Sequence, residues 1–374
     1  MQHIAINAHL LAPGNGYRRA GIHRYIYEVV SHLPGVDPDL RYTVLMNHQL
    51  EPALPRMATR VGPNTQRPWR RVLWEQGAQP LALQRLRPSL YHAMAFVSPR
   101  GLRCPSVVTV YDLSFIRYPE VLSPLRRRYL QMFTRNSCQR ATRIIAISES
   151  TARDLTDFWG IPADKIDVSS VGVTADFKPL PEAEVAAFRQ TKGLPERFLL
   201  FLGTLEPRKN LPMLLRAYAS LPESVRQAVH LILAGGKGWM FDEIFATISR
   251  HNLGETVHTP GYVPAEELVL WYNAAEALVY PTLYEGFGIP ILEAMACGKP
   301  VLASNSSSLP EATGDAGILL PSSDEAAWHE AMDRLISSPD ERTRMAARSR
   351  TWAAEFTWQR VARRTVESYY RALS

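Results

Sequence analysis

Short apolar runs rich in β-branched residues alternate with amphipathic segments of ten or more residues along the chain, and this alternation limits the possible folds more than any other feature. A buried parallel sheet has apolar strands, and each strand needs a crossover, usually a helix, to reach its parallel neighbour. The pattern therefore predicts βαβ units and an α/β fold. The strands expected in the first half are residues 3–8, 42–46, 90–93, 107–111, 144–147 and 166–171. Those expected in the second half are residues 198–202, 231–234, 257–259, 278–280, 301–303 and 317–320.

The pattern occurs twice, and 374 residues are about twice the usual size of one domain. It breaks near Lys178 to Pro181, where a new helix-then-strand unit begins. We therefore expect two domains with open α/β sheets, residues 1–180 and 181–355, followed by an amphipathic helix within 356–374 that leads into no strand. Ligands of open parallel sheets collect outside the carboxyl ends of the strands, so the chemistry is expected in the loops that follow them.

Charge and composition exclude several classes of protein. No apolar run approaches the ~20 residues that span a bilayer. The first residues read as a strand and lack a signal-peptide pattern, so the expected location is the cytoplasm, or the inner face of the membrane. The three cysteines form no C-x-x-C pair, which argues against a disulfide framework or a zinc site.

The charge is unevenly distributed. Residues 1–180 contain 23 Lys and Arg against 13 Asp and Glu, whereas the remainder contains 19 against 23. A basic first half favours an anionic partner, which is a membrane surface, a phosphorylated acceptor or nucleic acid, although a solvated basic face explains the same numbers.

The strongest candidate site lies in the segment YPTLYEGFGIPILEAMACGKPVLAS, which starts at Tyr280. A strand ends there, a glycine-bracketed loop follows, and Pro290 suits the first turn of a helix that Gly298 ends. A helix N-terminus binds anions, and carboxylates such as Glu285 and Glu293 accept hydrogen bonds from sugar hydroxyls. The segment thus predicts a site for a phosphate flanked by sugar. The alternative is a loop acid and a surface acid that complements the helix dipole.

A second candidate is the segment GTLEPRKN, in which an apolar strand runs into a loop with two adjacent cations. Arg208 and Lys209 would neutralise a diphosphate, as a magnesium ion does in other enzymes. The alternative is a solvated cationic turn.

Further candidates lie in the first half. The loop from Gly14 to Gly21 precedes a helix and allows a ligand to approach the backbone closely, with Gly21 as the expected donor contact. It lacks the G-x-G-x-x-G pattern, and no acid ends the next strand, which disfavours a hydride-transferring dinucleotide enzyme. His92 and Asp112 lie at predicted strand ends. Asp112 is a candidate catalytic residue, and His92 and Tyr111 are acceptor-side candidates. The alternatives are a polar loop or core residue for His92 and a cap on the following turn for Asp112.

These segments together resemble the retaining glycosyltransferases of family 4, also called glycosyltransferase group 1. YPTLYEGFGIPILEAMACGKPVLAS resembles their donor-site segment, GTLEPRKN their diphosphate loop, and AGIHRYIYEVV their N-terminal loop and helix. Order and spacing match over essentially the whole chain. The resemblance implies the GT-B architecture, with two Rossmann-like domains that face each other across a cleft. The acceptor would bind the first domain and the nucleotide sugar the second, and the terminal helix would return to the first domain.

The resemblance also implies residue roles. Glu285 would contact donor sugar hydroxyls, Glu293 the ribose, and Arg208 and Lys209 the diphosphate. The resemblance implies further contacts with the donor. The sugar and phosphate would be bound by the backbone of Gly286, Phe287, Gly288 and Leu292. The base would lie near Val263, and Thr204 would stand in the diphosphate loop. No metal or other cofactor is implied beyond the nucleoside diphosphate sugar itself.

Two positions depart from the family pattern. Many members have Arg where this chain has Thr204, which leaves more charge compensation to Arg208 and Lys209. Many also have His where this chain has Tyr111, and a phenol is a poor base near neutral pH, with an ordinary pKa of ~10. In the SNi-like scheme proposed for the family, the departing phosphate helps to deprotonate the acceptor, so that no strong protein base is needed.

The expected function is therefore retaining transfer of a mannose- or rhamnose-type hexose, with GDP-mannose favoured and UDP- or dTDP-sugars as alternatives. The acceptor would be a glycan or lipid-linked glycan of surface polysaccharide assembly. The competing interpretations are a GT-B epimerase or phosphorylase, and a non-catalytic nucleotide-sugar-binding protein. With this resemblance, nucleic acid is no longer the expected partner. The basic first half, with Arg126, Arg127, Arg128 and Arg135 on one predicted helix, favours a lipid-diphosphate acceptor or an anionic membrane.

Overall fold

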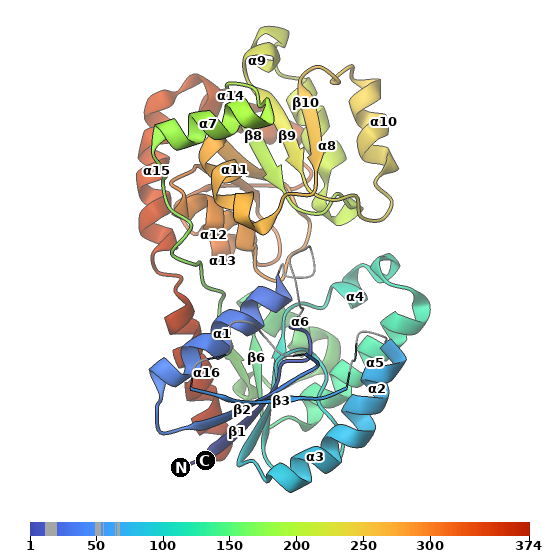
Figure 1. The fold of residues 1–374 in the computed structure, drawn as a ribbon. Coiled ribbons are helices and arrows are strands. Elements are labelled where there is room, and N and C mark those ends of the chain that lie inside the picture. Colours follow the sequence, from blue (N-terminus) through green and yellow to red (C-terminus); the bar gives the residue numbers. More distant parts are fainter. Residues whose placement is uncertain (12–20, 49–53, 55, 64, 66–67) are drawn as a thin grey trace. The chain divides into compact units, whose positions relative to one another are not determined.

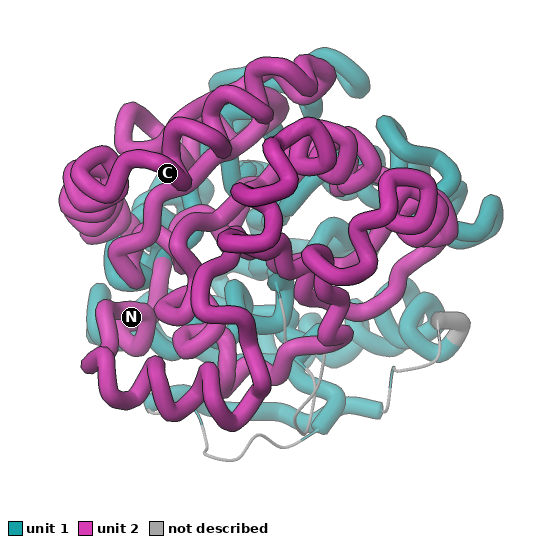
Figure 2. The backbone as a smooth tube through the Cα atoms, turned by 90° about the horizontal axis from the view of Figure 1, so that it is seen from above, with its two compact units in different colours: residues 1–172, 357–374 teal, residues 173–356 magenta. Residues whose placement is uncertain are grey.

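The computed structural model describes residues 1–11, 21–48, 54, 56–63, 65 and 68–374 and separates into two compact units. Unit 1 comprises Met1–Gly172 and Thr357–Ser374, and unit 2 comprises Val173–Phe356 (Figure 2). The sequence pattern places the divisions after residues 180 and 355, and the contacts within the structure place them after 172 and 356.

Unit 1 is built on a parallel sheet whose strand order is β3-β2-β1-β4-β5-β6-β7. The strands are β1 (His3–Asn7), β2 (Arg41–Met46), β3 (Ala58–Val61), β4 (Leu90–Ala93), β5 (Ser106–Val110), β6 (Arg143–Ala146) and β7 (Ile166–Val168). β1, β4 and β5 are buried along their whole length, as expected of strands covered on both faces. β3 is exposed at the sheet edge.

Helices cover both faces of this sheet (Figure 1). They are α1 (Ile22–Val36), α2 (Pro68–Leu73), α3 (Gln79–Leu86), α4 (Ser114–Arg117), α5 (Pro124–Arg140), α6 (Glu149–Trp159) and α16 (Trp358–Leu373), with a π-helical turn at Trp74–Ala78 and single 3₁₀ turns at Pro119–Val121 and Ala163–Lys165. The terminal helix α16 packs beside α1 and against β4, β5 and β6. Its Ser368 and Arg371 side chains donate hydrogen bonds to Asp167 of β7, which anchors the helix to unit 1.

Unit 2 has a second parallel sheet, in the order β10-β9-β8-β11-β12-β13. The strands are β8 (Phe198–Leu202), β9 (His230–Ala234), β10 (Val257–Gly261), β11 (Ala277–Tyr280), β12 (Val301–Ser304) and β13 (Ile318–Leu320). The order reverses between β8 and β11, which pair directly. In open α/β sheets a ligand site forms at such a reversal, because the loops after the two strands diverge there.

The helices of unit 2 are α7 (Glu182–Lys192), α8 (Leu211–Ala219), α9 (Glu223–Ala228), α10 (Asp242–Arg250), α11 (Leu268–Ala274), α12 (Ile289–Ala296), α13 (Leu309–Thr313), α14 (Glu325–Ser337) and α15 (Pro339–Ala353). Two 3₁₀ turns, Pro207–Lys209 and Ala265–Glu267, precede α8 and α11. The predicted α/β class with two parallel sheets is confirmed, and among the strands of the described residues the apolar pattern misses β3. None of the helices in the described residues is long and apolar enough to cross a membrane.

Candidate active site

The loops after β8 and β11 bring the two predicted motifs of unit 2 together. β8 runs through four fully buried residues and ends in a 3₁₀ turn that carries Arg208 and Lys209. The backbone amide of Leu283, in the loop after β11, donates to the carbonyl of Arg208 at 2.9 Å. The two loops are therefore hydrogen-bonded neighbours at the point where the strand order reverses.

Glu285 is held in this loop by its backbone. Its amide donates to Ser307 Oγ at 2.9 Å, and Ser308 Oγ donates to its carbonyl at 2.9 Å. The loop ends at Gly288, whose φ of 105° lies in the left-handed region and where a Cβ would come within 2.9 Å of Leu309. Pro290 then stands in the first turn of α12, as the sequence predicts.

The Glu285 carboxylate lies at the centre of the charged groups. Its Oε1 accepts from the Lys209 ammonium and, at 3.0 Å, from the Tyr280 hydroxyl, and its Oε2 accepts from Arg208 Nη1 at 3.4 Å. Burial alone raises the pKa of Glu285, but the charges of Lys209 and Arg208 outweigh it, so that its pKa is below the ordinary value. The carboxylate is thus ionised at neutral pH and already surrounded by donors.

Both cations are largely buried, which contradicts the alternative of a solvated turn. The Arg208 side chain is 16% exposed and that of Lys209 7%. Arg208 donates through Nε and Nη2 to Glu206 Oε1, at 3.0 and 2.8 Å, and through Nη1 to the carbonyl of Tyr284 at 2.9 Å. A buried charge is costly unless it is paired, so these contacts hold the guanidinium in a defined orientation.

Glu293 is a buried residue of α12 and not a surface acid. Only 4% of it is exposed, and its Oε2 accepts from the Tyr272 hydroxyl at 2.8 Å. Burial, and then the negative charge of Glu293, raise the pKa of Tyr272 well above its ordinary value, so the phenol stays a donor.

The other residues predicted to contact the nucleotide sugar differ in how exposed they are. Phe287 and Leu292 have buried side chains, so the backbone is what they offer to a ligand. Val263 follows β10 and is 8% exposed, whereas Thr204 is exposed in the loop after β8. Gly286 is buried beside Phe287.

In unit 1, two of the acceptor-side candidates have structural roles. His92 is fully buried, and its ring nitrogens are hydrogen-bonded to Tyr369 Oη at 2.7 Å and Thr109 Oγ1 at 2.8 Å. Burial lowers the pKa of His92 to about 3. Tyr111 is also buried and donates to the carbonyl of Met94 at 2.6 Å. Because their polar atoms are enclosed in the core, neither residue presents a group to an acceptor here.

The remaining candidates of unit 1 stand at loop positions. Asp112 follows β5, is partly buried, and accepts from the amide of Ser114 at 2.8 Å, which is the turn cap expected as the alternative. Gly21 precedes α1 with a φ of 56° and has open space where a Cβ would be. Residues 14–20 of the predicted loop lie outside the described part of the chain.

Three functional candidates escaped the sequence interpretation. Glu206 lies inside the GTLEPRKN segment, two residues before Arg208. That short spacing between an acid and a cation is the sequence signal that predicts their ion pair. Tyr280 is the first residue of the other candidate segment, five positions before Glu285, to which its hydroxyl donates. Trp239 reaches the site only through tertiary structure: it follows β9 and donates from Nε1 to Glu206 Oε2 at 3.2 Å.

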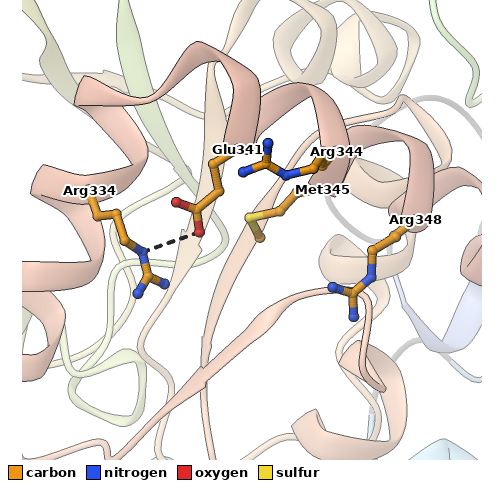
Figure 3. A pocket seen from close by; sticks show the side chains of 5 residues that line it. All are labelled: Arg334, Glu341, Arg344, Met345 and Arg348. Atoms are coloured by element: carbon orange, nitrogen blue, oxygen red, sulfur yellow. Dashed lines mark ion pairs between the residues drawn. The ribbon is translucent and has the colours of Figure 1, made fainter.

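A separate hollow of about 400 Å³ lies between α14 and α15 (Figure 3). It is lined by Arg334, Glu341, Arg344, Met345 and Arg348, of which Arg334 and Glu341 form an ion pair at 3.2 Å. It contains none of the predicted site residues.

Comparison with known proteins identifies the family. The profile of "Glycosyl transferases group 1" matches residues 184–352, and that of "Glycosyltransferase Family 4" matches residues 15–177. The O-antigen chain mannosyltransferase B of Escherichia coli is 35% identical over 292 residues, which cover 78% of this chain and 76% of that protein. This chain is a group 1 glycosyltransferase.

Two further relatives define the extent of the likeness. The serotype-specific mannosyltransferase WbdA of Escherichia coli is 27% identical over 316 residues, which cover 80% of this glycosyltransferase and 38% of WbdA. The sucrose-phosphate synthase of Thermosynechococcus elongatus has a solved structure that matches with a TM-score of 0.76 at 21% identity, over 99% of this chain and 98% of that one. The structural likeness shows the two-domain GT-B fold of this glycosyltransferase.

Proposed function

We propose that this glycosyltransferase moves a mannose- or rhamnose-type hexose from a nucleoside diphosphate sugar to a hydroxyl acceptor with retention of the anomeric configuration. The observation that carries the proposal is the pairing of two buried cations, Arg208 and Lys209, with Glu285 at the reversal of the unit 2 sheet. Cations and donors placed where charge develops stabilise a leaving group, and a diphosphate leaves with added negative charge.

The proposed step breaks the bond between the anomeric carbon and the diphosphate oxygen and forms one from that carbon to the acceptor oxygen, on the same face. The acceptor proton passes to the departing phosphate oxygen. Arg208 and Lys209 bind the diphosphate, and Glu285 exchanges part of its contact with them for sugar hydroxyls and positions the ring. Glu293 binds the ribose, and the backbone from Gly286 to Gly288 lies beside the phosphate at the start of α12.

The mannosyl donor is proposed from the relatives named as mannosyltransferases, which favour GDP-mannose over UDP- and dTDP-sugars. The names of these two relatives, an O-antigen chain mannosyltransferase and a serotype-specific mannosyltransferase, also favour a glycan or lipid-linked glycan of surface polysaccharide as acceptor. We place donor binding in unit 2 and acceptor binding in unit 1, where Asp112 at the end of β5 is the candidate contact.

A transfer assay with GDP-mannose, UDP-glucose and dTDP-rhamnose against a glycan acceptor panel tests the proposal, with NMR of the product anomer. We expect transfer from one donor class with retention. Inversion at the anomeric carbon contradicts the proposed mechanism. Sugar isomerisation without an acceptor, phosphorolysis of a glycan, or tight nucleotide-sugar binding without turnover would indicate the alternative functions.

We also propose that unit 1 contacts an anionic membrane through α5, at the inner face of the membrane. The support is that Leu125 and Met132, seven residues apart on one face of this helix, are 83% and 55% exposed. Four arginines accompany them, namely Arg126, Arg127, Arg128 and Arg135. Apolar contact and attraction to anionic headgroups reinforce each other in such a helix.

Vesicle sedimentation tests the membrane contact. We expect binding to phosphatidylglycerol vesicles at low salt, its loss at high salt, and weaker binding when Leu125 and Met132 are both replaced by Gln. Met240→Gln is the matched control, since this exposed methionine lies in unit 2. Absence of binding at low salt, or equal binding to neutral phosphatidylcholine vesicles, would contradict the membrane contact and would mean that these arginines form a solvated basic face.

A further inference from the structure

The carboxylate of Glu206 connects the proposed diphosphate loop to a second loop of unit 2. Its Oε1 accepts from Nε and Nη2 of Arg208, and its Oε2 accepts from the indole Nε1 of Trp239 at 3.2 Å. The residue is 7% exposed. Both oxygens of a nearly buried carboxylate are therefore engaged, one by the guanidinium and one by a residue 33 positions further along the chain.

The loop that carries Trp239 is tightly bound to the diphosphate loop through the backbone. The amide of Leu205 donates to the carbonyl of Gly236, and the amide of Gly238 donates back to the carbonyl of Leu205, both at 2.9 Å. At Gly235 a Cβ would lie 1.9 Å from the carbonyl oxygen of Gly203, so the two backbones are closer than any side chain allows. The loop that carries the indole is therefore held against the diphosphate loop by the main chain.

Arg208 lies between two carboxylates. Glu206 holds it at 2.8 Å, and Glu285 Oε2 is 3.4 Å from its Nη1. If Glu206 turned away, the guanidinium could close onto Glu285, which is the carboxylate proposed to receive sugar hydroxyls. The indole hydrogen bond opposes that rotation, because Oε2 would lose a buried donor.

We propose that Trp239 and Glu206 are positioning residues that hold Arg208 in its diphosphate-binding orientation and keep it from closing onto Glu285. The proposal rests on the proposed function, since it assigns the diphosphate to Arg208. Neither residue touches the reacting atoms. They act through the orientation of Arg208, the cation proposed to bind the leaving diphosphate.

The test is Trp239→Phe, which keeps an aromatic ring and all charges and removes the indole N–H together with the pyrrole part of the ring. Dissociation constants are measured by calorimetry for GDP and GMP, with the UDP/UMP and dTDP/dTMP pairs in parallel. Loss of a hydrogen bond to a charged group predicts about tenfold weaker binding of the diphosphate that the wild type prefers. The monophosphate, which lacks the second phosphate, should change less than about twofold.

A double-mutant cycle measures the coupling between Trp239 and Glu206. In the Glu206→Ala background Trp239→Phe should have no further effect, because the acceptor of its hydrogen bond is already gone. Glu206→Gln keeps one carbonyl oxygen and should fall between the wild type and Glu206→Ala. Trp271→Phe is the matched control: this indole of α11 donates to Glu267 Oε2, in the preceding 3₁₀ turn, at 3.4 Å, and its loss should leave the diphosphate-to-monophosphate ratio unchanged.

A ligand-independent measurement separates failure of this proposal from failure of the proposed function. The Nε–H NMR signal of Arg208, assigned by its absence in Arg208→Lys, should shift and broaden in Trp239→Phe and stay unchanged in Trp271→Phe. An unperturbed signal, or equal weakening of diphosphate and monophosphate binding, overturns the positioning role. If the wild type binds no nucleoside diphosphate more tightly than its monophosphate while the Arg208 signal still responds, the proposed function fails, and only the orientation of the Arg208 guanidinium by Trp239 and Glu206 stands.

Discussion

The ammonium of Lys209 donates to Oε1 of Glu285, although the two residues are 76 positions apart in the chain. Lys209 also lies over the Tyr280 ring, with Nζ 5.6 Å from its centroid, and the hydroxyl of that ring donates to the same oxygen. The cation, the carboxylate and the phenol thus form one buried group, in which a change to one member alters the charge balance of the others.

Replacing Glu285 should remove transfer. Glu285→Gln keeps the size of the side chain but loses the charge that balances Lys209, and Glu285→Ala also removes the contact with sugar hydroxyls. We expect kcat to fall at least about 100-fold in both variants, since a donor or acceptor that acts in the transition state is worth that much. Steady-state transfer kinetics measure this effect, and near-normal turnover of Glu285→Ala would falsify the site assignment.

Removing the charge of Lys209 should weaken nucleotide binding. In Lys209→Met, Glu285 loses the larger of its two stabilising charges, so its pKa rises. The proposed diphosphate loses an ion pair, and we expect GDP affinity, measured by calorimetry, to fall at least about tenfold.

Lys192→Met is the control for that substitution. Lys192 is paired with Glu267 at 2.7 Å in the same unit, but its side chain is 36% exposed. Such pairs contribute about 0.5 kcal/mol, so its removal should leave GDP affinity within about twofold of the wild type. If both lysine variants weaken GDP binding equally, Lys209 has no specific role.

The stability of the protein should decrease as the pH falls below 6.5, in part because of His92. Burial lowers the pKa of His92 to about 3, whereas the unfolded chain takes up the proton near 6.5. Between these values the unfolded state binds more protons, so the free energy of unfolding decreases with decreasing pH by about 1.4 kcal/mol per unit. Above pH 6.5 both states are neutral and this contribution is constant.

Urea unfolding between pH 4 and 8 measures this dependence in the wild type and in His92→Gln. The variant cannot titrate at this position, so its slope should be smaller by about one proton. His9, whose pKa burial lowers to about 4, contributes to both proteins equally and drops out of the comparison. Identical slopes in the two proteins contradict the assignment to His92.

Gly235→Ala should disrupt the paired loops after β8 and β9. Its Cβ would lie 1.9 Å from the carbonyl oxygen of Gly203, and its φ of 152° is rarely adopted by other residues. We expect more than about 2 kcal/mol of destabilisation by urea unfolding, together with weaker GDP binding, because backbone must move.

The adjacent glycine provides the control for this prediction. A Cβ added at Gly236 would have nothing within 4 Å, and its φ is not positive, so Gly236→Ala should change stability by less than about 0.5 kcal/mol. Similar losses in the two variants would mean that the loop tolerates no side chain at all, and that close approach at Gly235 is not the cause.

The buried strands were predictable, whereas β3, which is exposed along its whole length, was not. β8 and β11 carry uninterrupted apolar runs because helices cover both faces of each sheet. β3 was missed because its four residues are all exposed at the sheet edge and show no apolar pattern. Burial produces the sequence signal, and an edge strand has little of it.

The sequence by itself determined the α/β class, the two parallel sheets and the motifs that contain Arg208, Lys209, Glu285 and Glu293, because periodicity, loop glycines and charged loop residues are local properties of the chain. Only the tertiary structure decided which groups share a hydrogen bond. It joined Trp239 to Glu206, and it enclosed His92 between Thr109 and Tyr369, which lies 277 residues after His92 in the chain. Such pairings depend on which strand ends become neighbours in the sheet, and the spacing of residues along the chain does not determine this strand order.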